Sequence, residues 1–351
     1  MVVAHCAGST QKGFKMQRPE IYFFNSKSYE IKAFENSPLA KNLSFKFIPH
    51  RLDETSAKSI PDNSLICAFA SDDLGEKVLT ILKQKNIDKI LLRSAGFNHV
   101  DIDYAKKEGF KIARVPAYSP ESVAEHTVGL MLCLSRKIHK AYNRVREGNF
   151  SLEGLTGFTF HQKTVGIIGL GKIGMATAKI MRGFGCQVLA FDPMVSQELK
   201  EEAKENQIQI SELQKIFTES DIVSLHCPLT QETKHLIDET AIDSMKDGVM
   251  LINTGRGALI KTSCLITALK TKKIGSLGLD VYEEEEKLFF ADHSEEIIQD
   301  DTLMRLLSFP NVLITGHQAF LTNEALSNIA QTTLENALDL ANERDCPNKI
   351  F

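Results

Sequence analysis

The sequence of 351 residues contains no tryptophan, and its seven cysteines form no C-x-x-C pair. Without tryptophan, binding cannot be followed by indole emission. An odd number of scattered cysteines excludes a disulfide framework and argues against a zinc site, so we expect free thiols in a reducing, cytoplasmic compartment. We predict no metal site.

Two more absences narrow the class of protein. No apolar run approaches the roughly 18 residues of a membrane-spanning helix, and residues 1–17 lack the apolar centre of a secretory signal. We expect residues 1–17 to form a disordered tail. The 41 basic residues are outnumbered by 45 acidic ones, so the net charge of −4 offers no basic surface for nucleic acid. The length favours two globular domains.

Short apolar runs alternate with helical patterns along most of the chain. Strands that are apolar throughout and lie between helices are typical of parallel sheets covered on both faces, so two α/β units in tandem are predicted. Strands are predicted at 21–24, 65–69, 90–93 and 112–115 in the first unit, and from 164 and at 188–191, 222–225, 249–252, 276–279 and 312–315 in the second. Long helices are predicted over 122–138 and 324–340.

A G-x-G-x-x-G motif follows the strand that begins at residue 164. Gly169 permits a tight turn, Gly171 lets the backbone approach a pyrophosphate, and Gly174 lets the next helix pack closely on the strand. The motif alone is weak, because glycine turns are common in loops. The apolar strand before it and the helix after it favour a dinucleotide site over a structural turn.

The residues around this motif predict the kind of dinucleotide. Lys172 and Ile173 lie at the helix N-terminus, where free N–H groups and the helix dipole favour phosphate. Asp192 ends the next strand, where a carboxylate can bind the ribose hydroxyls of adenosine and oppose a 2′-phosphate. The predicted cofactor is therefore NAD.

Polar residues follow three later strands of the second unit, at the sheet edge where open parallel sheets bind ligands. Residues 253–257 place Arg256 between two glycines, residues 280–286 hold an aspartate and four glutamates, and His317 follows the last strand. An arginine between glycines suits capture of a carboxylate, and histidine is the usual proton carrier near neutral pH. Singly, each would more often be structural or solvated; together they indicate a catalytic site.

From about residue 21 to its end, the chain resembles the D-2-hydroxyacid dehydrogenases, and among them the fermentative D-lactate dehydrogenases of bacteria. The motifs that carry the resemblance, in order, are residues 92–101, 115–120, the glycine motif, 253–257, 278–285 and 316–320. Such an ordered series is highly specific.

The resemblance implies a catalytic role for Arg256, Glu285 and His317. The acid is the third of the four glutamates, because the family's pattern places it five residues after Asp280. The other three glutamates are then expected to lie at the surface.

The resemblance also implies a binding site for a small 2-oxoacid. Ser94, Ala95 and Gly96 match a loop whose N–H groups meet the substrate carboxylate, and Tyr118 and Phe320 match side chains that limit the space for substrate. Arg256 would bind the same carboxylate.

Three further residues are implied to bind the cofactor. His226, Thr254 and Asp280 match positions around the nicotinamide and its ribose.

The implied fold is α/β, with two flavodoxin- or Rossmann-like, doubly wound parallel-sheet domains and a cleft between them. The substrate-binding domain would be discontinuous, with residues 1–121 and 321–351, and the NAD-binding domain would span 122–320. A homodimer or homotetramer is expected, with neither nucleic acid nor membrane as a partner.

The predicted function is NAD-dependent reduction of pyruvate to D-lactate, with His317 as general acid and base. Two alternatives stay open: a dehydrogenase for another small 2-oxoacid, and an NADH-sensing scaffold similar to the corepressors that share this frame. Oxidation of NADH with a panel of 2-oxoacids separates them.

Overall fold

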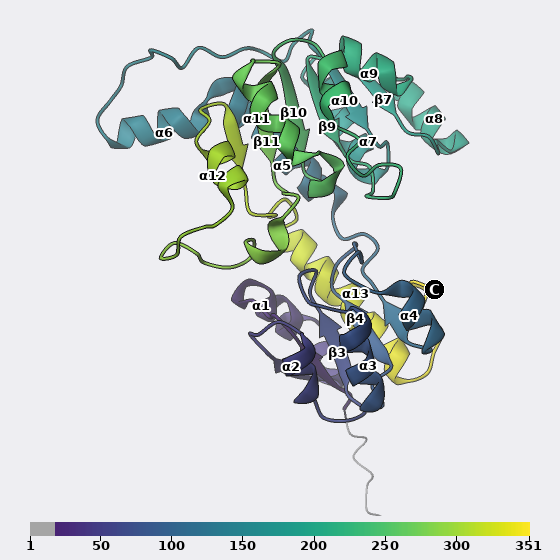
Figure 1. Ribbon diagram of the computed structural model, residues 1–351. Helices are drawn as coiled ribbons and strands as arrows, with labels where there is room; N and C mark the ends of the chain where they lie inside the picture. Colours follow the sequence, from purple (N-terminus) through teal and green to yellow (C-terminus); the bar gives the residue numbers. More distant parts are fainter. Residues whose placement is uncertain (1–17) are drawn as a thin grey trace, which may run out of the picture. The chain divides into compact units, whose positions relative to one another are not determined.

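The computed structural model describes residues 18–351, in two compact units (Figure 1). Unit 1 contains the chain up to Tyr118 and again Leu326–Phe351, and unit 2 contains Ser119–Ala325. The boundaries expected from the sequence lie a few residues away, at 121 and 320. The tail predicted at residues 1–17 lies outside the described residues.

Unit 1 is built on a five-stranded sheet in the order β2-β1-β3-β4-β5, and all of its strand pairs are parallel. Its elements are β1 (Glu20–Phe23), α1 (Ser28–Asn36), the 3-10 turn η1 (Ala40–Asn42), β2 (Ser44–Phe47), α2 (Glu54–Lys58), β3 (Leu65–Ala68), α3 (Glu76–Gln84), β4 (Lys89–Leu92), α4 (Ile102–Lys107) and β5 (Lys111–Ala113).

The end of the chain completes unit 1. Helix α13 (Asn323–Ala341) continues into unit 1, and Asn336 Nδ2 donates to the carbonyl of Arg114 at 2.9 Å. The last residues then run antiparallel to β5, where Ile350 N donates to Ile112 O at 2.9 Å and Arg114 N donates to Asn348 O at 3.0 Å. They cover the edge of the sheet, which would otherwise expose unpaired backbone groups.

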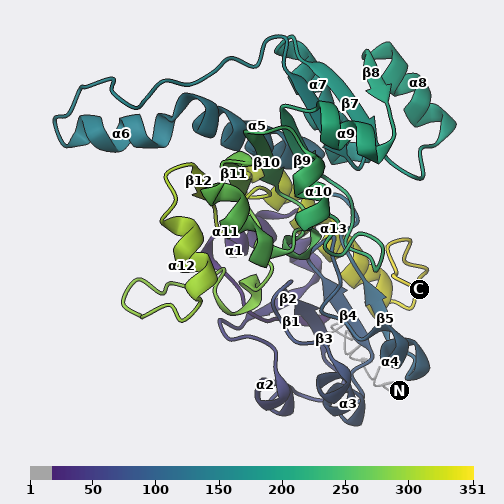
Figure 2. The ribbon, with the colours of Figure 1, turned by 45° about the horizontal axis from the view of Figure 1, so that its top comes forward.

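Unit 2 is built on a seven-stranded parallel sheet in the order β12-β11-β10-β9-β6-β7-β8 (Figure 2). Its elements are α5 (Pro120–Arg136), α6 (Ile138–Arg146), β6 (Thr164–Ile168), α7 (Lys172–Gly183), β7 (Gln187–Phe191), α8 (Gln197–Glu205), β8 (Ile208–Ile210), α9 (Leu213–Glu219), β9 (Ile222–Leu225), α10 (Glu239–Ser244), β10 (Val249–Asn253), η2 (Gly257–Leu259), α11 (Thr262–Lys270), β11 (Ile274–Leu279), η3 (Glu285–Lys287), α12 (Asp301–Leu307) and β12 (Val312–Ile314).

Helices cover this sheet on both faces, as its apolar strands require. One core packs α5 and α7 against the sheet, with Met131 and Met181 fully buried, and a second core packs α9 to α12 on the sheet, with Ile216 and Leu265 buried. Two doubly wound parallel sheets confirm the predicted fold class. In both sheets the strand order reverses beside the first strand of the unit, between β1 and β3 in unit 1 and between β6 and β9 in unit 2. Open parallel sheets bind ligands at the carboxyl ends of the strands at such a reversal.

Three elements were not expected from the sequence. Strands β2 and β8 are short edge strands with polar residues between their apolar ones. The helix predicted to end at Ile138 instead ends at Arg136, and α6 begins directly after Lys137, whose φ of 53° is left-handed. Figures 1 and 2 show α6 projecting from the rest of unit 2.

Candidate active site

The glycine motif forms the turn between β6 and α7. Gly169 has a φ of 93°, and a Cβ there would lie 2.5 Å from the backbone nitrogen of Cys227, so this position requires glycine. A Cβ on Gly174 would lie 2.0 Å from the carbonyl oxygen of Gly169, whereas one on Gly171 would meet no protein atom within 4 Å. Two glycines are therefore needed by the fold, and the third leaves space beside the turn.

The start of α7 fits a pyrophosphate. Helix α7 begins at Lys172 after Gly171, with no side-chain cap, so its first N–H groups, including that of Ile173, stay available to an anion. Next to it, the Asp192 carboxylate accepts hydrogen bonds from Leu170 N at 2.8 Å and Met194 N at 2.9 Å. These bonds fix the carboxylate beside the turn, as binding of a ribose requires.

The loop after β10 holds Arg256 in an unusual environment. Asn253 orders the loop, because its side chain donates to Arg256 O at 2.8 Å and accepts from Gly255 N at 3.0 Å. Gly257 packs on the backbone of Tyr282, where a Cβ would lie 2.1 Å from the carbonyl carbon. Within residues 18–351, Arg256 forms no ion pair, and its Nη1 donates to the neighbouring Gly255 carbonyl at 2.8 Å. A partly buried guanidinium without a carboxylate is suited to bind one from a ligand.

His317 and Glu285 form a pair at the ends of β12 and β11. The two residues are 32 positions apart in sequence, and Nδ1 of His317 lies 2.8 Å from Oε1 of Glu285. The other oxygen of Glu285 accepts from Tyr282 N at 2.8 Å, which holds the carboxylate in place. Glu285 thus orients the imidazole through Nδ1 and leaves Nε2 as the nitrogen that can exchange a proton.

Asp280 anchors the loop that carries His317. Its side chain is fully buried and accepts from Gln318 N at 2.9 Å and from Ala319 N at 2.8 Å, and the Thr315 hydroxyl also donates to it. Burial alone would raise the pKa of the Asp280 carboxyl, but hydrogen bonds from His126, Thr315 and the backbone outweigh burial and lower it. Its role toward the cofactor stays a prediction.

The other two residues predicted near the nicotinamide lie at the same edge of the sheet. His226 follows β9 and its Nε2 lies 2.9 Å from Ser224 Oγ, and burial lowers the pKa of His226 to about 4, so its imidazole is neutral at physiological pH. Thr254 follows β10, and its hydroxyl lies 2.8 Å from that of Thr127 on α5. Both side chains are thus fixed by hydrogen bonds.

The predicted substrate residues are divided between the units. Ser94, Ala95, Gly96 and Tyr118 belong to unit 1, whereas Phe320 and the trio predicted to be catalytic, Arg256, Glu285 and His317, belong to unit 2. Within unit 2, the trio comes from the carboxyl ends of β10, β11 and β12, which are neighbours in the sheet.

Sequence reasoning was wrong about one glutamate and overlooked one aromatic ring. Glu283 was expected at the surface, but it is half-buried, with Oε1 2.6 Å from His235 Nε2 and Oε2 accepting from Thr262 N at 3.0 Å.

The Phe290 ring lies 5.5 Å from the His317 ring, and both residues have positive φ, at 66° and 53°. The paired phenylalanines after the acidic run are the signal that could have drawn attention to this segment.

The described part of the chain contains neither a candidate metal cluster nor a candidate membrane-spanning helix. No cluster of three or more His, Cys, Asp or Glu side chains there is arranged to hold a metal ion. None of the helices of residues 18–351 has the length and apolarity that crossing a membrane demands.

Comparison with known proteins places this site in a family. Residues 128–319 match the family model described as D-isomer specific 2-hydroxyacid dehydrogenase, NAD binding domain. The chain is 50% identical to D-lactate dehydrogenase of Escherichia coli over 93% of this chain and 98% of that one.

Solved structures agree with the sequence comparison. The apo-structure of the Escherichia coli D-lactate dehydrogenase matches with a TM-score of 0.85 and 47% identity, over 95% of this chain and 100% of that one. D-lactate dehydrogenase from Aquifex aeolicus, solved with NAD and lactic acid, matches with a TM-score of 0.81 and 34% identity, over 94% of this chain and 98% of that one. The chain therefore belongs to the D-isomer specific 2-hydroxyacid dehydrogenases, and it is an oxidoreductase with NAD as its cofactor.

Proposed function

We propose that this enzyme catalyses the reversible reduction of pyruvate to D-lactate. The observation that carries the proposal is the 50% identity, over nearly the whole of both chains, to a D-lactate dehydrogenase. The ordered His317–Glu285 pair supports it, and so does the Arg256 guanidinium, which forms no ion pair within residues 18–351, because 2-oxoacid reduction needs a proton donor and a carboxylate ligand.

The proposal gives each residue one task. NADH, when bound, supplies the hydride. Arg256 holds the substrate carboxylate with its planar fork, together with the N–H groups of Ser94, Ala95 and Gly96. His317 donates a proton to the substrate carbonyl oxygen and recovers it in the reverse reaction, and the Glu285 carboxylate stabilises the imidazolium.

Residues of unit 2 are assigned to the cofactor in the same proposal. The glycine turn and the start of α7 hold the pyrophosphate, and the Asp192 carboxylate binds the ribose hydroxyls and repels the extra phosphate of NADP. His226, Thr254 and Asp280 are assigned to the nicotinamide end. With these assignments, the proposed NAD-binding domain spans 122–320 and the proposed substrate-binding domain comprises 1–121 and 321–351.

Substrate selectivity tests the function. The proposal assigns Tyr118 and Phe320 to the limit on substrate size, so pyruvate is expected to exceed phenylpyruvate in kcat/KM by about 10-fold to 200-fold. Loss of NADH absorbance is measured with pyruvate, glyoxylate, oxaloacetate and phenylpyruvate, and chiral chromatography identifies the lactate enantiomer. A higher kcat/KM for another oxoacid, or formation of L-lactate, would contradict the proposal.

We also propose that the enzyme is a cytoplasmic homo-oligomer. The six cysteines in the described residues are free thiols, as a reducing compartment favours. Helix α6 has no buried residue, and Ile138, Tyr142 and Val145 form an exposed apolar stripe along it. A stripe of this kind is typical of an association surface.

A charge introduced beside this stripe is expected to separate the subunits. Phe150 and Leu152 follow α6 and are 74% and 80% exposed, so replacing both with glutamate removes apolar contacts without disturbing the core. Size-exclusion chromatography with light scattering should show an oligomer for the wild type and monomers for the double variant. Ile297→Glu is the matched control, because Ile297 is 86% exposed in another loop of unit 2. A monomeric wild type would refute the assignment.

A further inference from the structure

In unit 1 a side chain of the protein itself joins the carboxyl ends of β1 and β3. Strand order in its sheet reverses between β1 and β3, and open α/β sheets commonly bind ligands at the carboxyl ends of such strands. Here the guanidinium of Arg93, the first residue after β4, reaches this place and is 2% exposed. It donates to the carbonyls of Phe24 and Asn25, just after β1, and of Cys67 in β3, at 2.7, 3.1 and 3.3 Å.

Arg93 is paired there with a buried carboxylate. Its Nε and Nη2 donate to the two oxygens of Glu30, each at 2.9 Å, which is the two-point geometry of the strongest arginine pairs. Glu30 also accepts from Lys27 N at 3.0 Å and thereby fixes the first turn of α1. The guanidinium carbon lies 4.9 Å from the centre of the Phe69 ring.

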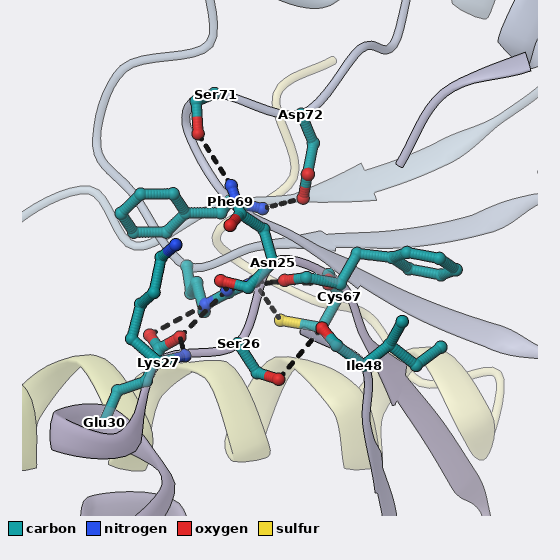
Figure 3. Close-up of polar contacts among 11 residues, drawn as sticks. Asn25, Ser26, Lys27, Glu30, Ile48, Cys67, Phe69, Ser71 and Asp72 are labelled. Carbon is teal, nitrogen blue, oxygen red and sulfur yellow. Dashed lines mark hydrogen bonds and ion pairs between the residues drawn. The ribbon is translucent and has the colours of Figure 1, made fainter. Parts of the chain in front are cut away.

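The loops around the ion pair are tied to one another (Figure 3). Asn25 has a left-handed φ of 48°, and its side-chain amide donates to Ser71 Oγ at 2.8 Å. Buried Asp72 accepts from Phe69 N at 2.6 Å and from Leu52 N at 2.9 Å. The segments after β1 and β3 therefore form a fixed frame around Arg93.

The three residues after Arg93 have their carbonyls turned into the protein. Ser94 O accepts from Val115 N at 3.2 Å, Ala95 O accepts from Arg114 Nη1 at 2.7 Å, and Gly96 O accepts from Ser94 Oγ at 2.8 Å. Within the part of the chain that the structure describes, the N–H groups of these three residues donate to no protein acceptor. Successive free N–H groups on a fixed backbone are suited to bind an anion.

We propose that the Arg93–Glu30 ion pair positions the carboxylate-binding loop, Ser94 to Gly96, for the substrate. The pair ties the backbone immediately before the loop to α1, β1 and β3 and so holds the three N–H groups in place. The inference rests on the proposed function, because that function assigns the loop to the substrate carboxylate. Stability alone is a weak reason for such a pair, since apolar replacements of buried ion pairs are often neutral or stabilising.

The test removes both charges together. A variant with Arg93→Met and Glu30→Leu removes both charges of the pair, leaves buried Asp72 its hydrogen bonds from Leu52 N and Phe69 N, and is expected to fold. Its KM for pyruvate and its Ki for oxamate, an amide of the same shape as pyruvate, should rise about tenfold, as loss of one charge-assisted hydrogen bond predicts. The Kd for NADH, followed by NADH fluorescence, should change less than twofold, and kcat should change less than KM.

Two controls separate positioning from a general loss of stability. Leu82→Ala removes a buried side chain of α3 in the same unit and should lower the thermal midpoint while leaving KM and Ki unchanged. Arg93→Lys keeps the positive charge but loses the planar guanidinium, so its KM for pyruvate should rise by less than that of the double variant. This single variant tests the positioning role should the double variant fail to fold.

The outcomes also distinguish this inference from the proposed function. A wild-type KM in the double variant, or an equal rise in KM in the Leu82 variant, would overturn the positioning role. A wild type that prefers another oxoacid would overturn the lactate assignment alone. The same comparison would then be made with that oxoacid, because all 2-oxoacids carry the carboxylate.

Discussion

Replacing His317 with asparagine is expected to lower kcat for pyruvate reduction by about 10²–10⁴-fold, because the variant loses its general acid. Asparagine suits the test, since it tolerates the left-handed φ of 53° at this position and carries no titratable proton. Steady-state kinetics give kcat, and NADH fluorescence should give an unchanged Kd. His293→Ala is the matched control, because His293 also pairs with a glutamate, Glu296 at 2.7 Å, in an exposed loop.

The pH dependence of the reaction in both directions also tests the assignment of His317 as general acid and base. Reduction consumes a proton and needs the protonated imidazole, so its kcat/KM should fall as the pH rises, whereas oxidation of D-lactate should fall as the pH falls. Glu285→Gln removes the carboxylate that orients the imidazole, so kcat/KM for pyruvate reduction should fall in this variant. An unchanged kcat/KM would show that the 2.8 Å contact between Glu285 and His317 is structural alone.

Changing Arg256 to lysine should lower kcat/KM for pyruvate by about 10-fold to 150-fold. Lysine keeps the positive charge but loses the planar fork, and a hydrogen bond to a charged group contributes about 1.5–3 kcal/mol. Since Arg256 forms no ion pair within the described residues, its replacement leaves no buried carboxylate unpaired, and the thermal midpoint should change little.

Two readouts separate loss of substrate binding from damage to the fold. In the Arg256→Lys variant, the Ki for oxamate should rise as kcat/KM for pyruvate falls. The Kd for NADH should stay within twofold of the wild-type value. Arg305→Lys, on the surface of α12, serves as the control and should match the wild type. Wild-type kcat/KM in the Arg256 variant would remove Arg256 from the proposed mechanism.

Much of the fold follows from local signals in the sequence. The apolar strands of both parallel sheets were located because a strand covered on both faces must be apolar along its whole length. The glycine turn was located because Gly169 and Gly174 satisfy strict steric demands. The break at Lys137 was missed, since lysine gives no signal for the left-handed conformation that ends α5.

The polar contacts of the site depend on residues far apart in sequence. Glu283 looks like a member of a solvated acidic run, and its partner His235 lies 48 residues away. Glu30 and Arg93 are 63 residues apart, and no periodicity connects them. Such pairs are fixed by the order of strands in the sheet, which one sequence alone does not state.

The return of the C-terminal residues to unit 1 has a consequence for synthesis on the ribosome. The last residues pair with β5 through Ile112 and Arg114, and roughly 200 residues of unit 2 separate the two parts of unit 1. At about 5–20 residues per second, the ribosome leaves the edge of β5 uncovered for roughly 10–40 s. Unit 2 is contiguous and can complete its sheet first, so the first unit to emerge is the last to finish folding.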